Sequence, residues 1–176
     1  MKVNPVLAYL PPNLLPSLLA PAAFIAGGFA AHQDLATDID VWVQTEDLHS
    51  TRRLMLTHLS AYGFPLTAVA TEMEQFTGDS CGYEDITANI LKVARVDQGN
   101  QKPIHLMVTD APPLMLLLNF DISTHQIALT ESGVIRGPEW TDVTDEPVVI
   151  KNHGTSKTGA RLEKIRARYA HLRRAA

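Results

Sequence analysis

A pair of glycines followed closely by two aspartates constrains this chain more than any other feature. Gly27-Gly28 comes after an apolar run, residues 23–26, that we expect to be a strand. The segment Asp38-Ile39-Asp40-Val41 begins after nine intervening residues. Because side chains alternate along a strand, the two aspartates should point to one face while the residues between and after them face the core.

Two neighbouring carboxylates repel each other unless a cation, a donor or a raised pKa compensates them, and Mg²⁺ is the simplest compensation. The glycines have no Cβ, so their backbone can turn tightly and approach a phosphate closely. Successive free N–H groups in such a turn form a concave anion site. The pattern therefore predicts that metal and triphosphate meet in one cleft. The alternative is an ordinary glycine turn beside a solvated strand face.

These residues resemble the signature of the DNA polymerase beta-like nucleotidyltransferase superfamily: hydrophobic-Gly-Gly/Ser, a gap, then hydrophobic-Asp-hydrophobic-Asp/Glu. In that superfamily the glycine turn opens a helix, here about residues 29–33, and the acids sit on the next strand. The resemblance implies that Gly27 and Gly28 bind the nucleotide. It also implies that Asp38 and Asp40 are catalytic ligands of Mg²⁺ or Mn²⁺.

Two further segments extend the resemblance over most of the chain. Phe120-Asp121-Ile122-Ser123, with residues 125–129 after it, resembles a Phe-Asp strand motif of phage and viral members. Residues 157–169 resemble their closing Arg/Lys/Tyr helix. The chain is therefore identified as similar to a small phage-type member of the superfamily.

The third acid of the superfamily is missing from the strand where it is expected, residues 103–108, and His105 takes that position. Histidine suits Mn²⁺ or Zn²⁺ better than Mg²⁺, so His105 either replaces the acid as a metal ligand, weakens metal binding or abolishes catalysis. It could also be a neutral strand residue. Asp121 is the preferred substitute for the third catalytic acid, ahead of Asp110, which could instead cap a helix.

Composition favours one domain over residues 1–176. With 176 residues and 45% hydrophobic content, the chain can bury a core without disulfide or metal staples. Cys81 is the single cysteine, which excludes an internal disulfide and suits a cytoplasmic location, in a bacterial host if a phage encodes the chain. The N-terminal apolar run contains several prolines, so we expect neither a signal peptide nor a membrane helix, but a short helix over residues 13–20.

The fold class expected is α+β, with a mixed, largely antiparallel sheet of the nucleotidyltransferase type flanked by helices. Thr45 should cap a helix that ends near Gly63, and residues 86–96 should pair with the strand that holds His105. The other expected elements are a helix over residues 114–118, a strand over 120–129 turning into 134–135, and a loop over 71–84.

Charge is concentrated at the C-terminus. From Lys151 onwards the chain carries a formal +7, which leaves −11 for the rest of a chain of net charge −4. A helix over about residues 156–174 would place apolar positions 162, 165, 169 and 172 against the sheet and its basic residues elsewhere. Those basic residues are either simply solvated or bind RNA, DNA or the phosphates of a nucleotide. The candidate nucleic-acid contacts are Lys157, Arg161, Lys164, Arg166 and Arg168.

The function expected from these features is metal-dependent transfer of a nucleoside monophosphate from an NTP to an acceptor, with an RNA such as tRNA favoured. One alternative is a degenerate fold that binds nucleic acid or protein without catalysis, for which His105 is the best support. Another is a toxin- or antitoxin-type modifier. The sequence identifies neither the nucleotide nor the oligomeric state.

Overall fold

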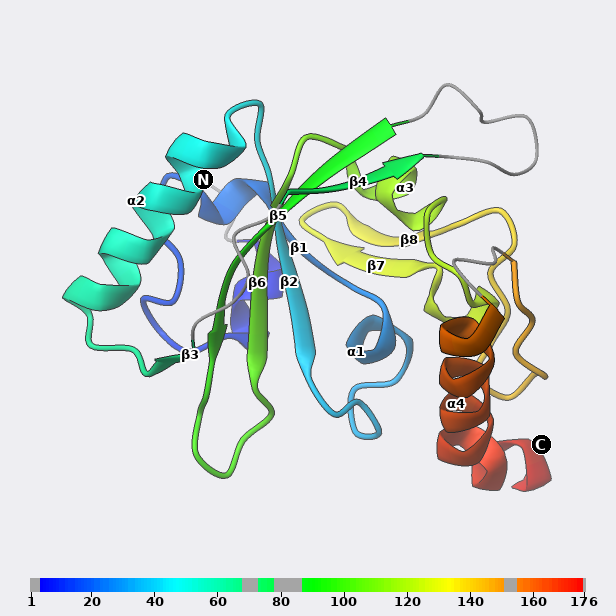
Figure 1. Ribbon diagram of the computed structural model, residues 1–176. Coiled ribbons are helices and arrows are strands. Elements are labelled where there is room, and N and C mark those ends of the chain that lie inside the picture. Colours follow the sequence, from blue (N-terminus) through cyan, green and yellow to red (C-terminus); the bar gives the residue numbers. More distant parts are fainter. Residues whose placement is uncertain (1–3, 68–72, 78–86, 151–154, 176) are drawn as a thin grey trace.

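The computed structural model describes residues 4–67, 73–77, 87–150 and 155–175, which form one mixed β-sheet with helices packed on it (Figure 1). The strands are β1 (Ala23–Ala26), β2 (Ile39–Gln44), β3 (Leu66–Thr67), β4 (Met73–Thr77), β5 (Thr87–Val96), β6 (Ile104–Thr109), β7 (Ile127–Thr130) and β8 (Gly133–Arg136). Their order in the sheet is β3-β5-β6-β2-β1-β7-β8, and β4 pairs with β5. The pairings are antiparallel except between β2 and β6, which confirms the expected α+β class.

Four α-helices and three 3₁₀-helices are present in the described residues. The α-helices are α1 (Gly28–Ala31), α2 (Leu48–Ala61), α3 (Pro113–Leu117) and α4 (Thr155–Ala175). The 3₁₀-helices are η1 (Pro5–Tyr9), η2 (Ala20–Ala22) and η3 (Ser123–His125). Figure 1 shows α2 on one side of the sheet and α4 on the other, beside α1. None of the helices described has the length and apolar character needed to span a membrane.

Alternation along β2 divides the core between the two faces of the sheet. Ile39, Val41 and Val43 join the cluster beneath α2, which also contains Met55 and Leu59. Trp42 joins the opposite cluster, where α3 packs against the sheet. Asp40 lies between Ile39 and Val41, so the pleat turns its side chain away from the α2 core, as the spacing predicts.

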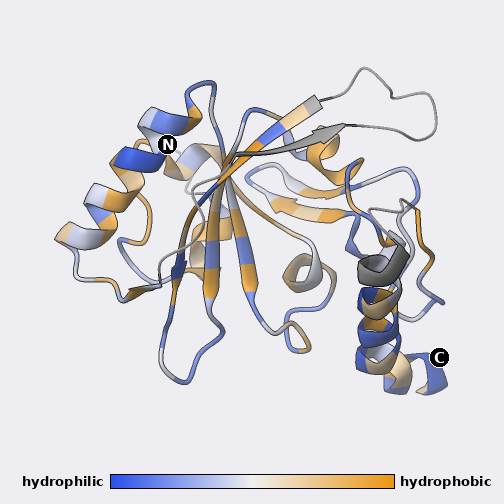
Figure 2. Ribbon diagram, viewed as in Figure 1, coloured by the Kyte–Doolittle hydropathy of each residue, from blue (hydrophilic) through white to orange (hydrophobic). Residues whose placement is uncertain are grey.

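Helix α4 packs through an apolar stripe, although not onto the sheet as expected. Ile165 and Tyr169 are buried with Ile122 and Val143, and Leu162 and Leu172 pack at the edge of this cluster. The partly buried Ala31 of α1 and Leu35 also contact it. The rest of α4 is mostly hydrophilic (Figure 2). The helix therefore lies against α1 and the segment after α3, which brings its basic residues toward the glycine turn.

The helix expected over residues 13–20 is wrong. Pro11, Pro12 and Pro16 remove backbone donors and favour turns there, so the chain forms turns between η1 and η2 instead. Asn4 begins η1, because its side chain accepts a hydrogen bond from the N–H of Val6.

The expected cap of α2 is displaced by two residues. Asp47, not Thr45, is the N-cap, and its Oδ1 accepts a hydrogen bond from the N–H of Ser50 at 2.9 Å. The Thr45 hydroxyl bonds to that of Thr51 at 2.8 Å instead. The backbone N–H of Thr45 extends the pairing of β2 with β6, because it donates to the carbonyl of Thr109.

Two other expectations need correction. The strand expected over residues 120–129 begins only at Ile127, as β7, because η3 turns the chain just before it and Ile122 makes only an isolated bridge to Val149. The interval 71–84 contains strand β4, and the rest of that expected loop lies outside the described residues, as does Cys81. The β5–β6 and β7–β8 hairpins and α3 lie where they were predicted.

Candidate functional site

The glycine turn connects the end of β1 to α1 and is held closely on several sides. Gly27 has φ +81°, a conformation that side chains disfavour, and its N–H donates to the carbonyl of Ile127 on the neighbouring strand. A Cβ placed on Gly27 would lie 3.7 Å from Oδ2 of Asp40 and 3.5 Å from Cε2 of Phe120. The turn therefore lies beside the second aspartate, as the sequence pattern predicts, and both line one recess.

The two aspartates have partly exposed carboxylates, with Asp40 on β2 and Asp38 in the bend just before it. Their side chains are 37% exposed for Asp38 and 35% for Asp40, so both reach solvent from a shared face. Thr37 donates a long hydrogen bond of 3.4 Å to Asp38.

His105 faces both aspartates from the neighbouring strand. The parallel β2–β6 register pairs Asp40 with His105, and Nδ1 of His105 lies 3.3 Å from Oδ1 of Asp40 and 3.9 Å from Oδ2 of Asp38. The hydrogen bond to Asp40 raises the pKa of His105, with the charges of Asp40 and Asp38 acting in the same direction, while burial and the Arg95 charge oppose them. An imidazolium here is itself a cation that compensates the carboxylates.

Helix α4 supplies positive charge to the same place. We use "the cleft" for a recess of about 160 Å³ into which β2, the glycine turn, η3 and α4 all contribute side chains or backbone. Residues from four separate parts of the sequence thus meet at one point. Its lining is Gly28, Thr37, Asp38, Asp40, His125, Arg161, Lys164, Ile165 and Arg168.

A second recess of about 170 Å³ shares Asp40 and Arg161 with the cleft and adds Gly27, Phe120 and Asp121. Asp121 is buried, at 4% exposure, and its Oδ1 lies 3.0 Å from Nη1 of Arg161. The preferred third acid is therefore near the other two aspartates but is already paired with a cation. To bind metal, it would have to exchange Arg161 for the ion.

The described residues contain no group of three or more His, Cys, Asp or Glu side chains arranged to hold a metal ion. An all-protein metal cage is thus not present in this part of the chain. Mg²⁺, however, is commonly bound by one or two carboxylates together with substrate phosphates and water. Asp38 and Asp40, which are partly exposed and lie beside the glycine turn, fit that mode of binding.

The remaining sequence candidates lie apart from the cleft or outside the description. Arg166 points elsewhere on α4, where it pairs with Glu163 at 2.8 Å and also with Glu146. Lys157 is in the first turn of α4, and its side chain is outside the described residues. Asp110, the lower-ranked acid, accepts a hydrogen bond from the N–H of Asn89 at 2.8 Å, and it lines neither recess.

Thr37 and His125 line the cleft, although no sequence pattern points to either as a site residue. The sequence predicts a strand through His125, whereas η3 directs its ring toward Gly28. Residues 121–126 are mostly polar, so no hydrophobic period in the sequence marks His125 as a residue of the core or of a site.

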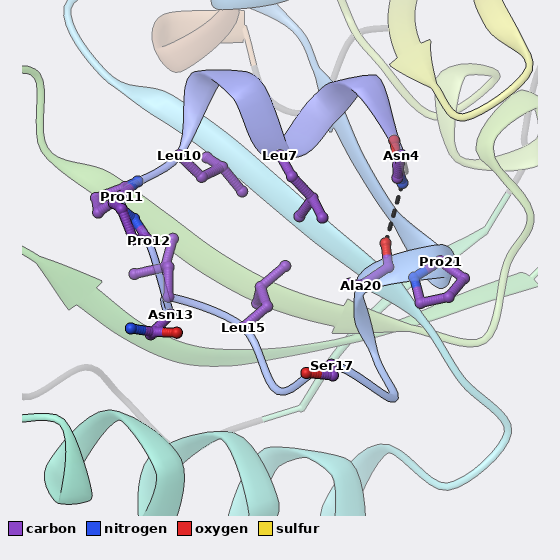
Figure 3. A pocket seen from close by; sticks show the side chains of 11 residues that line it. Asn4, Leu7, Leu10, Pro11, Pro12, Asn13, Leu15, Ser17, Ala20 and Pro21 are labelled. Carbon is purple, nitrogen blue, oxygen red and sulfur yellow. Dashed lines mark hydrogen bonds between the residues drawn. The ribbon is translucent and has the colours of Figure 1, made fainter. Parts of the chain in front are cut away.

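A larger cavity, about 350 Å³, lies under η1 and is lined mainly by leucine and proline (Figure 3). Asn4 closes one end of it by donating hydrogen bonds to the carbonyls of Ala20 at 3.0 Å and Ala23 at 2.8 Å. It shares no lining residue with the cleft and contains no acidic, basic or histidine side chain. We therefore place the candidate site at the smaller cleft, where the ionisable groups converge.

No protein-family model matches the chain, and no curated protein is a significant match to it.

Proposed function

We propose that the chain is a metal-dependent nucleotidyltransferase of the DNA polymerase beta-like type, which moves a nucleoside monophosphate from an NTP to an acceptor. The observation that carries the proposal is the meeting of Gly28, two aspartates and three basic side chains of α4 around one cleft. A metal–triphosphate complex needs carboxylates for the ion, cations for the phosphate oxygens and a backbone that permits close approach.

Each group has a role in this proposal. Asp38 and Asp40 would hold Mg²⁺ or Mn²⁺, which supplies charge neutralisation at the phosphates when it is bound. Gly27 and Gly28 leave space for the triphosphate beside the acids. Arg161, as well as pairing with Asp121, lines the cleft, so it can position both the acid and an anionic ligand.

The acceptor favoured is RNA. The supporting feature is the formal +7 of residues 151–176, which attracts a polyanion to the part of the chain that contains α4. The exposed basic residues beyond the cleft then add contacts to the acceptor.

A second function, nucleotide or nucleic-acid binding without catalysis, is favoured by one specific contact. His105 occupies the place of the third acid and approaches Asp40 to 3.3 Å, with a raised pKa. A protonated His105 would compensate the carboxylates without any metal and would compete with an ion for Asp40.

Transfer of label from each α-labelled NTP to RNA, with Mg²⁺ or Mn²⁺, tests the first function. We expect label transfer by the wild type and its loss, by at least a hundredfold, in Asp38→Asn and Asp40→Asn, because each change removes a charged metal ligand. Asp34→Asn, an exposed aspartate that lines neither recess, is the matched control and should transfer normally.

The outcomes separate the two functions. Absence of transfer from every nucleotide with either metal, while the wild type still binds NTP, would support the noncatalytic function. Unchanged transfer in both cleft variants would contradict the assignment of Asp38 and Asp40.

A further inference from the structure

His125 has an unusual environment for a buried histidine. Its side chain is 5% exposed, and neither ring nitrogen has a hydrogen-bond partner among the described residues. Buried polar groups nearly always find partners, so both ring nitrogens of His125 are available to bind a further group. The ring also lines the cleft, where a ligand can reach it.

Gly28 keeps that ring accessible. A Cβ built on Gly28 would lie 3.7 Å from both Nε2 and Cε1 of His125, and 3.5 Å from Nη1 of Arg168. These are ordinary van der Waals distances, so a methyl group would just fit above Gly28. It would lie between an imidazole nitrogen of His125 and a guanidinium nitrogen of Arg168. A side chain at position 28 would fill this space without a severe clash.

The surroundings of His125 determine what can occupy this space. Burial, together with the charges of Arg161 and Arg168, lowers the pKa of His125 to about 3, so the ring is neutral at physiological pH. A neutral imidazole has one N–H donor and one acceptor nitrogen. Arginine and lysine have donors only, so the neighbouring cations cannot accept from the imidazole N–H. The matching partner is an acceptor oxygen, and the cations select an anionic one.

We propose that His125 is a phosphate-binding residue, whose neutral ring donates a hydrogen bond to a non-bridging oxygen of the nucleotide's polyphosphate. Arg161, Lys164 and Arg168 complete this phosphate subsite over Gly28. The inference rests on the proposed function in one respect, which is that the ligand is a nucleotide. The subsite itself requires neither metal nor the two aspartates.

Binding of inorganic tripolyphosphate, measured by calorimetry in EDTA, tests the subsite apart from the metal site. We expect His125→Leu to weaken binding about tenfold or more, because a hydrogen bond to a charged group is lost. His125→Gln keeps an amide donor and should retain most of the affinity.

Gly28→Ala provides an independent test because it leaves His125 in place. The substitution adds helix propensity in α1, so the melting temperature should stay the same or rise, whereas tripolyphosphate binding should weaken severalfold as the methyl group covers the ring. Arg168→Gln should also weaken binding. Arg174→Gln, the same change at an exposed position near the end of α4, is the matched control and should not.

Wild-type affinity in both His125→Leu and Gly28→Ala would overturn the inference. If His125→Leu does not fold, the ring ¹⁵N resonances of wild-type His125 decide: they shift on saturation with tripolyphosphate if the ring binds it, and unchanged resonances contradict the proposal. Failure of the proposed function gives a different result from failure of this inference. In that case NTP transfer would be absent, while tripolyphosphate binding would still depend on His125.

Discussion

His105 contacts Asp40 because β2 and β6 run parallel in a register that pairs the two residues. The pair links folding to pH. The folded-state pKa of His105 is raised, so its stabilising effect is complete below about 6.5, the ordinary value for histidine, and is lost as pH rises through the raised value. Because both side chains are about one-third exposed, solvent screening keeps this effect below about 1 kcal/mol.

Replacing His105 with aspartate should convert this arrangement into a three-carboxylate site. Without metal, His105→Asp should lower the melting temperature, because three like charges then adjoin one another. Added Mg²⁺ or Mn²⁺ should raise the melting temperature of the variant more than that of the wild type, since a third carboxylate strengthens binding of the ion.

Differential scanning fluorimetry across a metal titration measures both effects. His49→Asp makes the same change on the exposed side of α2 and should leave the metal response as in the wild type. An unaltered metal response in His105→Asp would show that position 105 does not take the place of the third acid.

Helix α4 positions the basic half of the cleft through apolar packing as well as through the ion pairs that Arg161 and Arg166 make with Asp121 and Glu146. Ile165 and Tyr169 are 2% and 0% exposed, and they lie one turn apart on the face toward Ile122. The basic residues Arg161, Lys164 and Arg168 then face the glycine turn.

Ile165→Ala should lower the free energy of unfolding by about 2–4 kcal/mol, through the lost burial and the cavity left behind. Ala167→Ser, at an exposed position of the same helix, should change it by no more than about 0.5 kcal/mol. Urea denaturation measures both values. A loss below about 1 kcal/mol for Ile165→Ala would mean that α4 is only weakly attached through this stripe.

The elements with a clear period could be predicted from the sequence. Alternation identified β2 and the faces of Asp38 and Asp40, and helical spacing identified the buried stripe of α4. The predictions failed where local turns interrupt the regular elements, as among the prolines before Pro21 and at η3, where three polar residues turn the chain just before β7.

The cleft itself could be only half predicted. The short sequence interval between Gly28 and Asp38 predicts that the glycine turn lies near the acids, because a strand, a turn and the next strand are neighbours in the chain. The approach of Arg168 and His125 to Gly28 depends on packing between segments far apart in sequence, which no local pattern encodes. Charge alone therefore left nucleic acid and the phosphates of a nucleotide as alternative ligands of the basic residues of α4, and three of these residues line the cleft.

At the scale of the whole chain, an acidic body is joined to a basic C-terminal segment. The −11 of residues 1–150 repels a polyanion, and the +7 of residues 151–176 attracts it. An RNA acceptor should therefore approach along α4 and end at the cleft, where its last phosphates would meet the cations that also face the donor nucleotide.

The salt dependence of RNA binding tests this arrangement. Replacing Arg161, Lys164 and Arg168 together with glutamine should reduce the slope of log affinity against log salt by about 2, since each phosphate contact to a single strand contributes about 0.7. Fluorescence anisotropy of a labelled tRNA over a KCl series gives the slope. Arg52, Arg53 and Arg95, outside the C-terminal segment, provide the matched triple substitution.

The two triple variants have equal charge, so any difference between them reflects location and not net charge. If both reduce the slope equally, RNA responds only to the overall charge of the molecule. If the cleft triple leaves the slope unchanged while tripolyphosphate binding falls, these three cations serve the donor nucleotide alone. The acceptor must then contact other basic residues of α4, of which Arg174 at its exposed end is the first to replace.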